Sequence, residues 1–301
     1  MNDLIFSIQH IYRPYSDNIT ETDNSIIYRA QDLNLAKDVC IKKIVIPGTS
    51  EAELKRNYQK ALSEARTMVK VSSRTSAVPS IHLTYYDSKE SNLFIVMDWV
   101  QGNTLNAYIE EGPQKVSEFE FVTWIEELCA ILSTMSELNI YHKDIKPENI
   151  IVDSFRKVHL IDFNISVSLP NKIEGTPFYR APEMETSTSL SRNKVDVFAI
   201  GVILYKYYTN KVPSKGSEYG QKSIRNKNPE WDLFIHPKEL NAKMAERMDA
   251  IITDCMRKDP TNRSSIKTLH RDIKNYKREI KKHGKKDHRR DQDGPSGTRR
   301  Q

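Results

Sequence analysis

The first third of the chain combines short apolar runs with one helical pattern. Residues 39–42, followed by Ile44 and Ile46, and residues 93–97 have the length and apolar character typical of β-strands. Between them, residues 51–71 place apolar side chains at spacings of three and four, which predicts an amphipathic helix. These side chains are Leu54, Tyr58, Ala61, Leu62, Ala65, Met68 and Val69. The order strand, helix, strand indicates a small lobe.

Helical patterns dominate the rest of the chain. Residues 98–103 break the apolar run and contain Gly102, which predicts a hinge. Beyond it, residues 121–138 and 195–208 predict strongly apolar helices, and residues 242–255 and 266–276 predict amphipathic ones. We therefore expect a small lobe followed by a larger, mainly helical one.

Composition favours an intracellular globular protein. The chain has 301 residues and three cysteines, Cys40, Cys129 and Cys255, in apolar surroundings without metal-ligand spacing. We expect reduced thiols with no disulfide or zinc site. The start of the chain lacks the pattern of a secretion signal, and no apolar run is long enough to span a membrane. The sequence thus predicts a soluble, cytoplasmic protein.

The net charge of +6 is concentrated at the C-terminal end. Residues 271–301 contain 12 Lys and Arg against 5 Asp and Glu, so the rest of the chain carries about −1. Residues 284–301 have almost no apolar side chain, and we expect them to be disordered. Such a basic tail can contact an acidic partner, nucleic acid or anionic lipid. The simpler interpretation is a solvated tail that favours solubility.

Residues 141–149 place an acid, a lysine and an amide on one short loop between apolar segments. Asp144 could accept a proton from an attacking hydroxyl, Lys146 could offset phosphoryl charge, and Asn149 could ligate a metal. Thirteen residues after Asn149, Asp162 ends an apolar run where a second metal ligand would be wanted. This combination indicates a phosphotransferase.

With these motifs in this order, the chain resembles the eukaryotic-type protein kinase family over roughly residues 11–270. Asp144, Asn149 and Asp162 match the catalytic-loop and D-F-G motifs, and residues 175–183 match the end of the activation segment. The resemblance implies an α+β, bilobal protein kinase fold with a small β-rich N-lobe containing one helix and a larger, mainly helical C-lobe. We expect the N-lobe at 1–97, the hinge at 98–103, the C-lobe at 104–275 and the basic tail at 276–301.

The same resemblance assigns structural roles outside the chemistry. Asp196 matches the buried acid that supports the catalytic loop, and Arg263 matches the arginine that pairs with Glu183. His142 and Phe163 resemble members of an apolar stack between the lobes, with Met68 as a third member.

The resemblance also implies ATP and Mg²⁺ as cofactors and a protein Ser or Thr hydroxyl as acceptor. Lys42 would hold the α- and β-phosphates and pair with Glu64, while Asp144 acts as base beside Lys146. Asn149 and Asp162 would bind magnesium. The implied nucleotide contacts are Ile27 and Cys40 over the adenine, Met97 at the gatekeeper position, and the backbone of Asp98 to Val100.

The chain departs from the family most clearly in the phosphate-covering loop. The three glycine positions are occupied by Thr20, Thr22 and Ser25, so the loop should be stiffer and nucleotide binding weaker or slower. Asn164 replaces the glycine after Asp162 and Phe163. Lys143 replaces the arginine before the catalytic aspartate, which keeps the charge but loses bidentate geometry. Control by phosphorylation of Ser166, Ser168 or Thr176 is open, and so is constitutive activity.

Three functions are compatible with these residues. The leading interpretation is an active Ser/Thr protein kinase, because all six implied catalytic and metal-binding side chains are present. The alternative is a pseudokinase or scaffold, which the missing glycines favour. A small-molecule phosphotransferase would share the acids, but it would not be expected to have residues 175–183.

Overall fold

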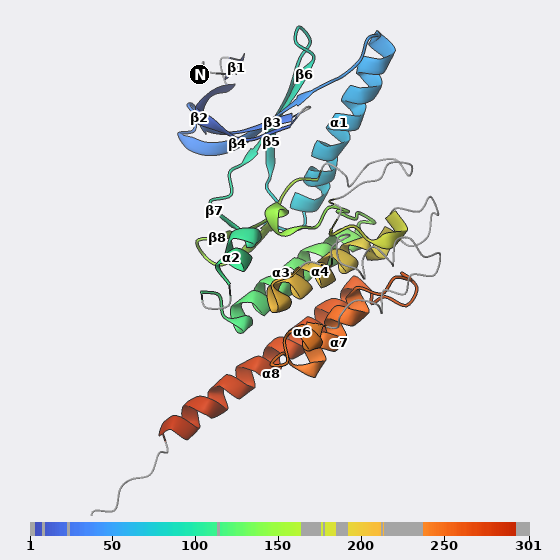
Figure 1. The fold of residues 1–301 in the computed structure, drawn as a ribbon. Coiled ribbons are helices and arrows are strands. Elements are labelled where there is room, and N and C mark those ends of the chain that lie inside the picture. The colour runs from blue at the N-terminus through green and yellow to red at the C-terminus, as the bar shows by residue number, and fades with distance from the viewer. Residues whose placement is uncertain are drawn as a thin grey trace, which may run out of the picture.

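The computed structural model shows a molecule with a sheet-containing part and a larger helical part (Figure 1). It describes residues 4–7, 10–22, 25–112, 115–163, 176, 178–184, 192–211, 213 and 237–292, and of these only the backbone for 16–18, 22, 192 and 283–292.

The N-terminal part is built on a six-stranded antiparallel sheet in the order β1-β2-β3-β4-β6-β5. Its strands are β1 (Leu4–Ser7), β2 (His10–Thr22), β3 (Ser25–Asp32), β4 (Lys37–Val45), β5 (Ile81–Asp87) and β6 (Asn92–Asp98). The predicted runs at 39–42 and 93–97 lie within β4 and β6, which are neighbours in the sheet. The prediction of a β-rich first lobe is confirmed.

Helix α1 (Glu51–Ser72) packs beside β5 and β6 and confirms the predicted helix. Ser50 caps it, because the Ser50 hydroxyl accepts a hydrogen bond from the backbone N–H of Glu53 at 3.3 Å. The helix turns one face toward the sheet, with buried Glu64, Ala65, Thr67, Met68 and Val71. Val69 belongs to the apolar pattern of the sequence, yet it is 50% exposed.

The C-terminal part is mainly helical. Its helices are α2 (Leu105–Glu111), α3 (Glu118–Glu137), α4 (Val195–Thr209), α6 (Pro237–Leu240), α7 (Glu246–Cys255) and α8 (Ile266–Gln292). A small sheet of β7 (Gly102–Thr104), β8 (Ile150–Asp153) and β9 (Val158–Leu160) lies toward the first lobe. Short 3₁₀ turns occupy Pro147–Asn149, Pro182–Met184 and Arg192–Lys194.

Three helix boundaries differ from the sequence prediction. Helix α3 begins before residue 121 because Ser117 caps it, accepting a hydrogen bond from the Glu120 N–H at 3.3 Å. Ala242 precedes α7, and Ala245 is its N-cap. Helix α8 continues to Gln292, so the expected disorder from residue 284 is wrong for residues 284–292.

The C-lobe core forms around α4, which is buried on most of its circumference. The Tyr207 ring stacks on Phe121 of α3 with centroids 3.6 Å apart. Gly201 faces α7 so closely that a Cβ there would lie 2.7 Å from the Cβ of Cys255. Glycine at this position therefore lets α4 and α7 approach each other.

The chain crosses between the lobes over a short distance. Strand β6 ends at Asp98, and β7 begins at Gly102 and pairs with β8. A Cβ at Gly102 would lie 2.3 Å from the Val152 carbonyl oxygen, so this position requires glycine. The domain division proposed from sequence stays a prediction, and α8 runs across its boundary at 275 and 276.

Within the described ranges, none of the helices combines the length and the apolar content that membrane crossing requires.

Candidate active site

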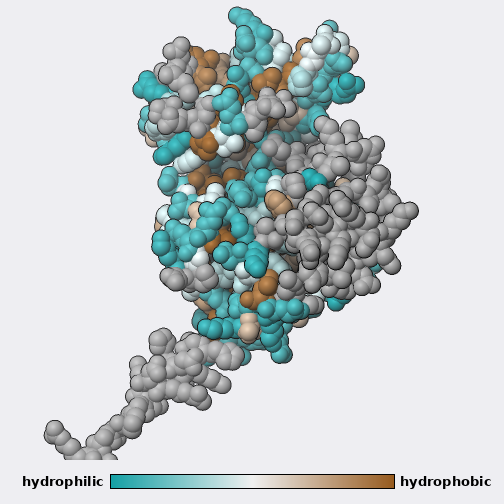
Figure 2. Space-filling view, viewed as in Figure 1, coloured by the Kyte–Doolittle hydropathy of each residue, from teal (hydrophilic) through white to brown (hydrophobic). Residues whose placement is uncertain are grey.

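A cleft of about 550 Å³ lies between the two lobes. Apolar surface is visible in brown between the upper and lower lobes in Figure 2. The predicted site residues that line it are Thr20, Ile27, Cys40, Lys42, Glu64, Met97, Asp98, Val100, Lys146, Asn149 and Asp162. Segments far apart in the sequence thus form one concave site. Sites that bind ligands are usually concave.

Lys42, Glu64 and Asp162 form an ion-paired group at the inner end of the cleft. The Lys42 Nζ donates to Glu64 Oε1 at 2.8 Å and to Asp162 Oδ1 at 3.1 Å. Lys42 comes from β4 and Glu64 from the sheet-facing side of α1, and both side chains are buried. One cation therefore joins the sheet, the helix and the C-lobe acid.

Charge coupling sets the protonation of this group. Burial alone would lower the pKa of Lys42, but the Glu64 and Asp162 carboxylates outweigh it and raise that pKa. Burial opposes ionisation of Asp162, yet the Lys42 ammonium outweighs burial and lowers the pKa of Asp162. Burial raises the pKa of Glu64, which the shared lysine offsets only in part. Lys42 and Asp162 are therefore charged at neutral pH.

Asp144 lies at the centre of a second polar group. Its Oδ1 accepts hydrogen bonds from the Thr176 N–H and from the Thr176 hydroxyl, each at 2.9 Å. Its Oδ2 accepts from Asn149 Nδ2 at 3.2 Å and lies 3.4 Å from Lys146 Nζ. Asp144 does not line the cleft itself, but Lys146 and Asn149 do.

Asp196 of α4 supports the loop that carries Asp144. Its two carboxylate oxygens accept hydrogen bonds from the backbone N–H of His142 at 2.9 Å and of Lys143 at 2.7 Å. Lys143 has a φ of 67°, which is uncommon for a residue with a Cβ, and its bond to Asp196 helps to hold this conformation. The supporting position expected for Asp196 is observed.

Asp162 also has a left-handed backbone, with a φ of 62°. The preceding residue, Ile161, accepts a hydrogen bond from His142 Nε2 at 3.2 Å, and the His142 ring meets Phe163 edge-on with centroids 4.9 Å apart. Met68 is buried in α1 and also lines the cleft. Residues other than glycine that are held in the left-handed backbone conformation, as Asp162 is, often mark functional sites.

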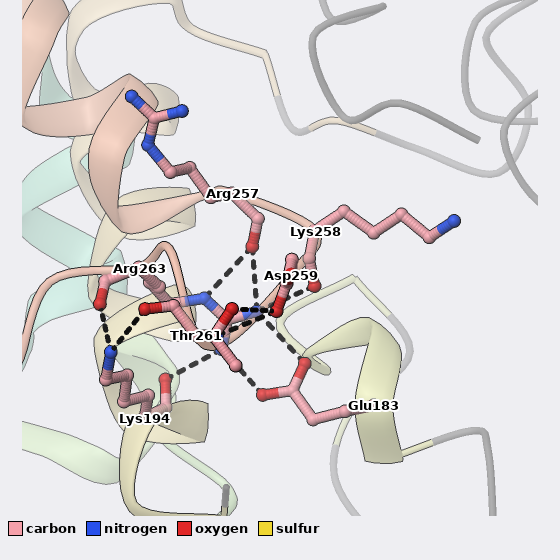
Figure 3. A network of polar contacts seen from close by, with 7 residues as sticks. All are labelled: Glu183, Lys194, Arg257, Lys258, Asp259, Thr261 and Arg263. Atoms are coloured by element: carbon pink, nitrogen blue, oxygen red, sulfur yellow. Dashed lines mark hydrogen bonds and ion pairs between the residues drawn. The ribbon is translucent and has the colours of Figure 1, made fainter. Parts of the chain in front are cut away.

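Glu183 and Arg263 form a buried bidentate ion pair (Figure 3). Arg263 Nη1 donates to Glu183 Oε1 at 2.6 Å, and Nη2 donates to Oε2 at 3.0 Å. Arg263 also donates to the carbonyl oxygens of Lys194 and Arg257 at 2.9 and 3.1 Å, so its charge is well compensated. This pair fixes the end of the segment that contains Thr176 to the C-lobe, as the sequence predicted.

The apolar roof of the cleft contains one residue that the sequence analysis missed. Ile19 lines the cleft together with Ile27 and Cys40, although 49% of Ile19 is exposed. It precedes Thr20 and is the one apolar residue in the polar run 16–22, which is the signal that could have identified it. Burial raises the pKa of the Cys40 thiol to about 11.

The glycine-free segment lies in paired strands β2 and β3, whose register shifts between Asn18 and Thr20. Thr20 pairs with Ile27 and Thr22 pairs with Ser25 in the β2–β3 register. Because directly paired residues share a face of the sheet, these positions lie on the same face as Lys42, which pairs with Ile27. Thr20 lines the cleft, whereas Ser25 does not. The side chain of Thr22 lies outside the described residues.

An aromatic clamp beside the hinge was also missed. The guanidinium carbon of Arg29 lies 5.1 Å from the ring centroids of Tyr15 and of Trp99. Arg29 Nε donates to Asp38 Oδ2 at 3.1 Å, and the Tyr15 hydroxyl donates to Asp38 Oδ1 at 2.7 Å. Since Trp99 lines the cleft, this clamp joins the hinge to β2, β3 and β4.

Several positions in the activation segment lie outside the described residues. They are Asn164, Ser166, Ser168, Gly175 and Pro177. Thr176 is described, and its contact with Asp144 was not expected from sequence.

Comparison with the sequences of known proteins places the chain in a family. A sequence model of the protein kinase domain matches residues 17–274. The chain therefore belongs to the protein kinase family, and the predicted bilobal α+β fold is confirmed.

The curated relatives include serine/threonine-protein kinases of bacteria. PrkC of Bacillus subtilis is 26% identical over 258 residues, which cover 82% of this chain and 38% of PrkC. PknB of Mycobacterium tuberculosis is 27% identical over 258 residues, or 79% of this chain and 38% of PknB. A probable serine/threonine-protein kinase of Clostridium acetobutylicum is 26% identical over 247 residues, with 79% and 36% covered. The chain thus spans less than two fifths of the length of these relatives.

Proposed function

We propose that this chain is an ATP- and magnesium-dependent protein kinase that phosphorylates serine or threonine hydroxyls. The observation that carries the proposal is the convergence of the Lys42 ion-paired group and the Asp144 polar group on one cleft. The names of the relatives, which are serine/threonine-protein kinases, support the choice of acceptor.

Asp144 is the proposed catalytic base. The acceptor hydroxyl oxygen would bond to the γ-phosphorus while the bond from that phosphorus to the β–γ bridging oxygen breaks. The hydroxyl proton would pass to Asp144, and ADP would leave with the electron pair. Thr176, Asn149 and Lys146 all contact the Asp144 carboxylate and would hold it in orientation.

The cleft side chains suit a nucleotide with its metal. Lys42, held by Glu64, would contact the α- and β-phosphates, and Lys146 would face the γ-phosphate. Asn149 uses its Nδ2 to bond Asp144, so its amide oxygen can serve as a ligand together with the ionised Asp162. When it is bound, Mg²⁺ neutralises part of the negative charge of the nucleotide phosphates.

Adenine would occupy the outer part of the cleft. Ile27 and Cys40 would contact one face of the base, Met97 would limit its depth, and the Asp98 to Val100 backbone would donate and accept hydrogen bonds. Ile19 would add an apolar contact at the entrance. All these residues line the same cleft.

A pseudokinase is the second candidate function. The observation that favours it is the pairing of Thr20 with Ile27 and of Thr22 with Ser25, which places residues with a Cβ where the family has glycine. A backbone that bears Cβ atoms approaches phosphates less closely. A small-molecule phosphotransferase is less well supported, because the Glu183–Arg263 pair anchors a segment of the kind that supports a peptide acceptor.

Transfer of phosphate from radiolabelled ATP with magnesium would test the proposal. The wild type should label itself or a basic protein substrate, and Asp162→Ala should abolish labelling. Glu246→Ala on α7 is a matched control, since this carboxylate is 87% exposed and pairs with Lys238 of α6. Absence of labelling in the wild type, together with absence of nucleotide binding, would favour the pseudokinase.

A further inference from the structure

Helix α8 has two chemically distinct faces. Ile266, Leu269, Ile273 and Tyr276 are buried against the domain, and the Tyr276 hydroxyl donates to Glu118 at 2.7 Å. The opposite face carries exposed lysine and arginine side chains, which follow one another at spacings of four and three residues. They are Lys267, Arg271, Lys274, Arg278 and Lys281, with Lys282 beside the last. We call these six residues the basic stripe.

The stripe is long and continuous. At about 1.5 Å rise per residue, Lys267 and Lys281 are roughly 21 Å apart along the helix. The backbone continues as helix to Gln292 and projects beyond the domain (Figure 1). The sequence of this extension adds Lys285, Lys286, Arg289 and Arg290.

Helix α8 accounts for all the excess positive charge of the chain. Residues 266–292 contain 11 Lys and Arg against 4 Asp and Glu, which gives +7, whereas the whole chain carries +6. The remaining residues therefore carry a net charge of −1. A cationic helix on a slightly acidic body is a localised feature, and the excess does not reflect a uniformly basic surface.

Most of the stripe lacks a neutralising partner within the described part of the chain. Lys267 Nζ lies 3.7 Å from Glu137 Oε1, but the two side chains are 70% and 63% exposed. An ion pair this exposed contributes little to stability. Lys274, Arg278, Lys281 and Lys282 form no ion pair with the described residues. Of the acids of the helix, Asp272 pairs with Arg271 of the stripe, whereas Glu279 pairs with Arg247 of α7.

Repulsion within the stripe has a free-energy cost. Like charges three or four residues apart destabilise a helix. The effect reaches Lys277, whose pKa is lowered by burial and further by Lys281 and Arg278. A bound polyanion would remove this repulsion, so the stripe is electrostatically complementary to one.

The surroundings of the stripe favour a narrow polyanion over a flat one. The stripe has no apolar side chain that could insert into a bilayer, as an interfacial helix would need. Acids lie against it, since Glu137 of α3, which is 63% exposed, is 3.7 Å from Lys267, and Asp272, which is 33% exposed, pairs with Arg271. A flat anionic membrane would bring these acids against its own charge, whereas a strand of phosphates can follow the stripe alone.

We propose that the basic stripe of α8 is a nucleic-acid-binding surface that contacts the phosphate backbone without reading base sequence. Its cations have the spacing and number to neutralise several phosphates, and binding of this kind depends on counterion release. The proposal does not depend on kinase activity, because α8 contributes no residue to the cleft.

Fluorescence anisotropy with a labelled DNA duplex of about 20 base pairs tests the proposal. The wild type should bind, with affinity falling steeply as salt rises. The variant Lys274→Glu/Arg278→Glu/Lys281→Glu should bind at least tenfold more weakly at about 0.1 M salt. The slope of log K against log salt should be less negative by about three for this variant. Each lost phosphate contact removes about 0.9 from the magnitude of the slope.

A matched variant controls for total charge. Lys55→Glu/Lys60→Glu/Lys70→Glu reverses three exposed lysines of α1 and should retain wild-type affinity. Should the α8 reversal fail to fold in a thermal melt, the same three positions changed to glutamine serve instead. Vesicles containing phosphatidylglycerol are the second probe. Binding to vesicles but not to duplex, no binding to either, or equal loss in the α1 control would each overturn the proposal.

Discussion

Arg29 connects the cleft to the N-lobe sheet, with its guanidinium carbon 5.1 Å from the centroids of two aromatic rings. Each exposed cation–π contact contributes about 0.5–1 kcal/mol. Arg29→Ala should therefore raise the dissociation constant for ATP about threefold to tenfold, because Trp99 of the hinge loses its support. Arg29→Lys should not restore affinity, since an ammonium lacks the planar surface.

Isothermal titration calorimetry with ATP and magnesium measures this effect. Arg74→Ala removes an exposed arginine after α1 and is the control. Equal affinity for Arg29→Ala and the wild type would show that the clamp does not position the hinge.

Cys40 provides a pH-dependent probe of the same cleft. Burial raises the pKa of its thiol to about 11, and the thiolate is the reactive form. Iodoacetamide should therefore react slowly with the native protein near neutral pH and faster as the pH rises toward about 11, and ATP should slow the reaction. Mass spectrometry locates the modification, and Cys40→Ala should abolish it because Cys129 and Cys255 are buried. A pH-independent rate, or no protection by ATP, would contradict this account.

Residue-level prediction from the sequence succeeded where a residue belongs to an ordered motif. Lys42, Glu64 and Asp162 were predicted to share a site, and the structure brings them within hydrogen-bonding distance. The Arg29 clamp was missed because its partners lie on separate strands and in the hinge, and no local motif connects them. The Thr176 contact with Asp144 was missed for the same reason, as it joins residues that are 32 apart in sequence.

At the scale of elements, the proposed nucleotide site makes the approach of the β2–β3 backbone to the phosphates testable. Replacing Thr20, Thr22 and Ser25 together by glycine should lower the KM for ATP, because glycine removes the Cβ atoms and admits positive φ. The hairpin should also become less ordered, so thermal stability should fall slightly. Initial-rate kinetics measures the KM, and Thr49→Gly/Thr75→Gly controls for added glycine elsewhere. An increased KM would mean that the hydroxyl groups themselves bind the nucleotide.

The contact between α4 and α7 depends on Gly201. Gly201→Ala places a Cβ where Cys255 and Met256 leave only 2.7 Å, and overpacking of this kind costs about 1–3 kcal/mol. Urea denaturation should show this loss in the free energy of unfolding. Ala250→Leu adds bulk on the exposed side of α7 and should change stability little. Unchanged stability in Gly201→Ala would mean that the helices separate without cost.

Element prediction was most reliable for segments with a continuous apolar face. Helices α1 and α4 were predicted almost to their ends, because core packing follows their apolar periodicity. The start of α3 was missed because its first turn depends on the Ser117 cap and not on apolar residues. The end of α8 was missed because residues 281–292 have no apolar face from which a helix could be recognised.

At the scale of the whole molecule, buried tyrosines predict a loss of stability at alkaline pH. Burial, reinforced by Glu118, raises the pKa of Tyr207 to about 12 and also raises those of Tyr208 and Tyr276. The folded state then holds these protons more tightly than the unfolded state, whose tyrosines titrate near 10. Stability should be full below about pH 10 and decrease as the pH rises further.

Urea denaturation at a series of pH values measures this dependence. Tyr276→Phe removes the hydrogen bond to Glu118 and should therefore lower the free energy of unfolding near neutral pH. Because phenylalanine has no hydroxyl to ionise, the further decrease of this free energy above pH 10 should be smaller than in the wild type. A free energy of unfolding that stays constant to about pH 11 would contradict the buried, protonated state of these tyrosines.

The most direct test of the central claim compares phosphate transfer and ATP binding in the wild type and in Asp144→Asn. The substitution preserves size but removes the base, so transfer to serine or threonine should fall by about 10²–10⁴, while the dissociation constant for ATP stays within about twofold. This result would establish that the cleft is a working kinase site with Asp144 as its base. Equal transfer by both proteins, or a wild type that binds ATP without transferring phosphate, would contradict it.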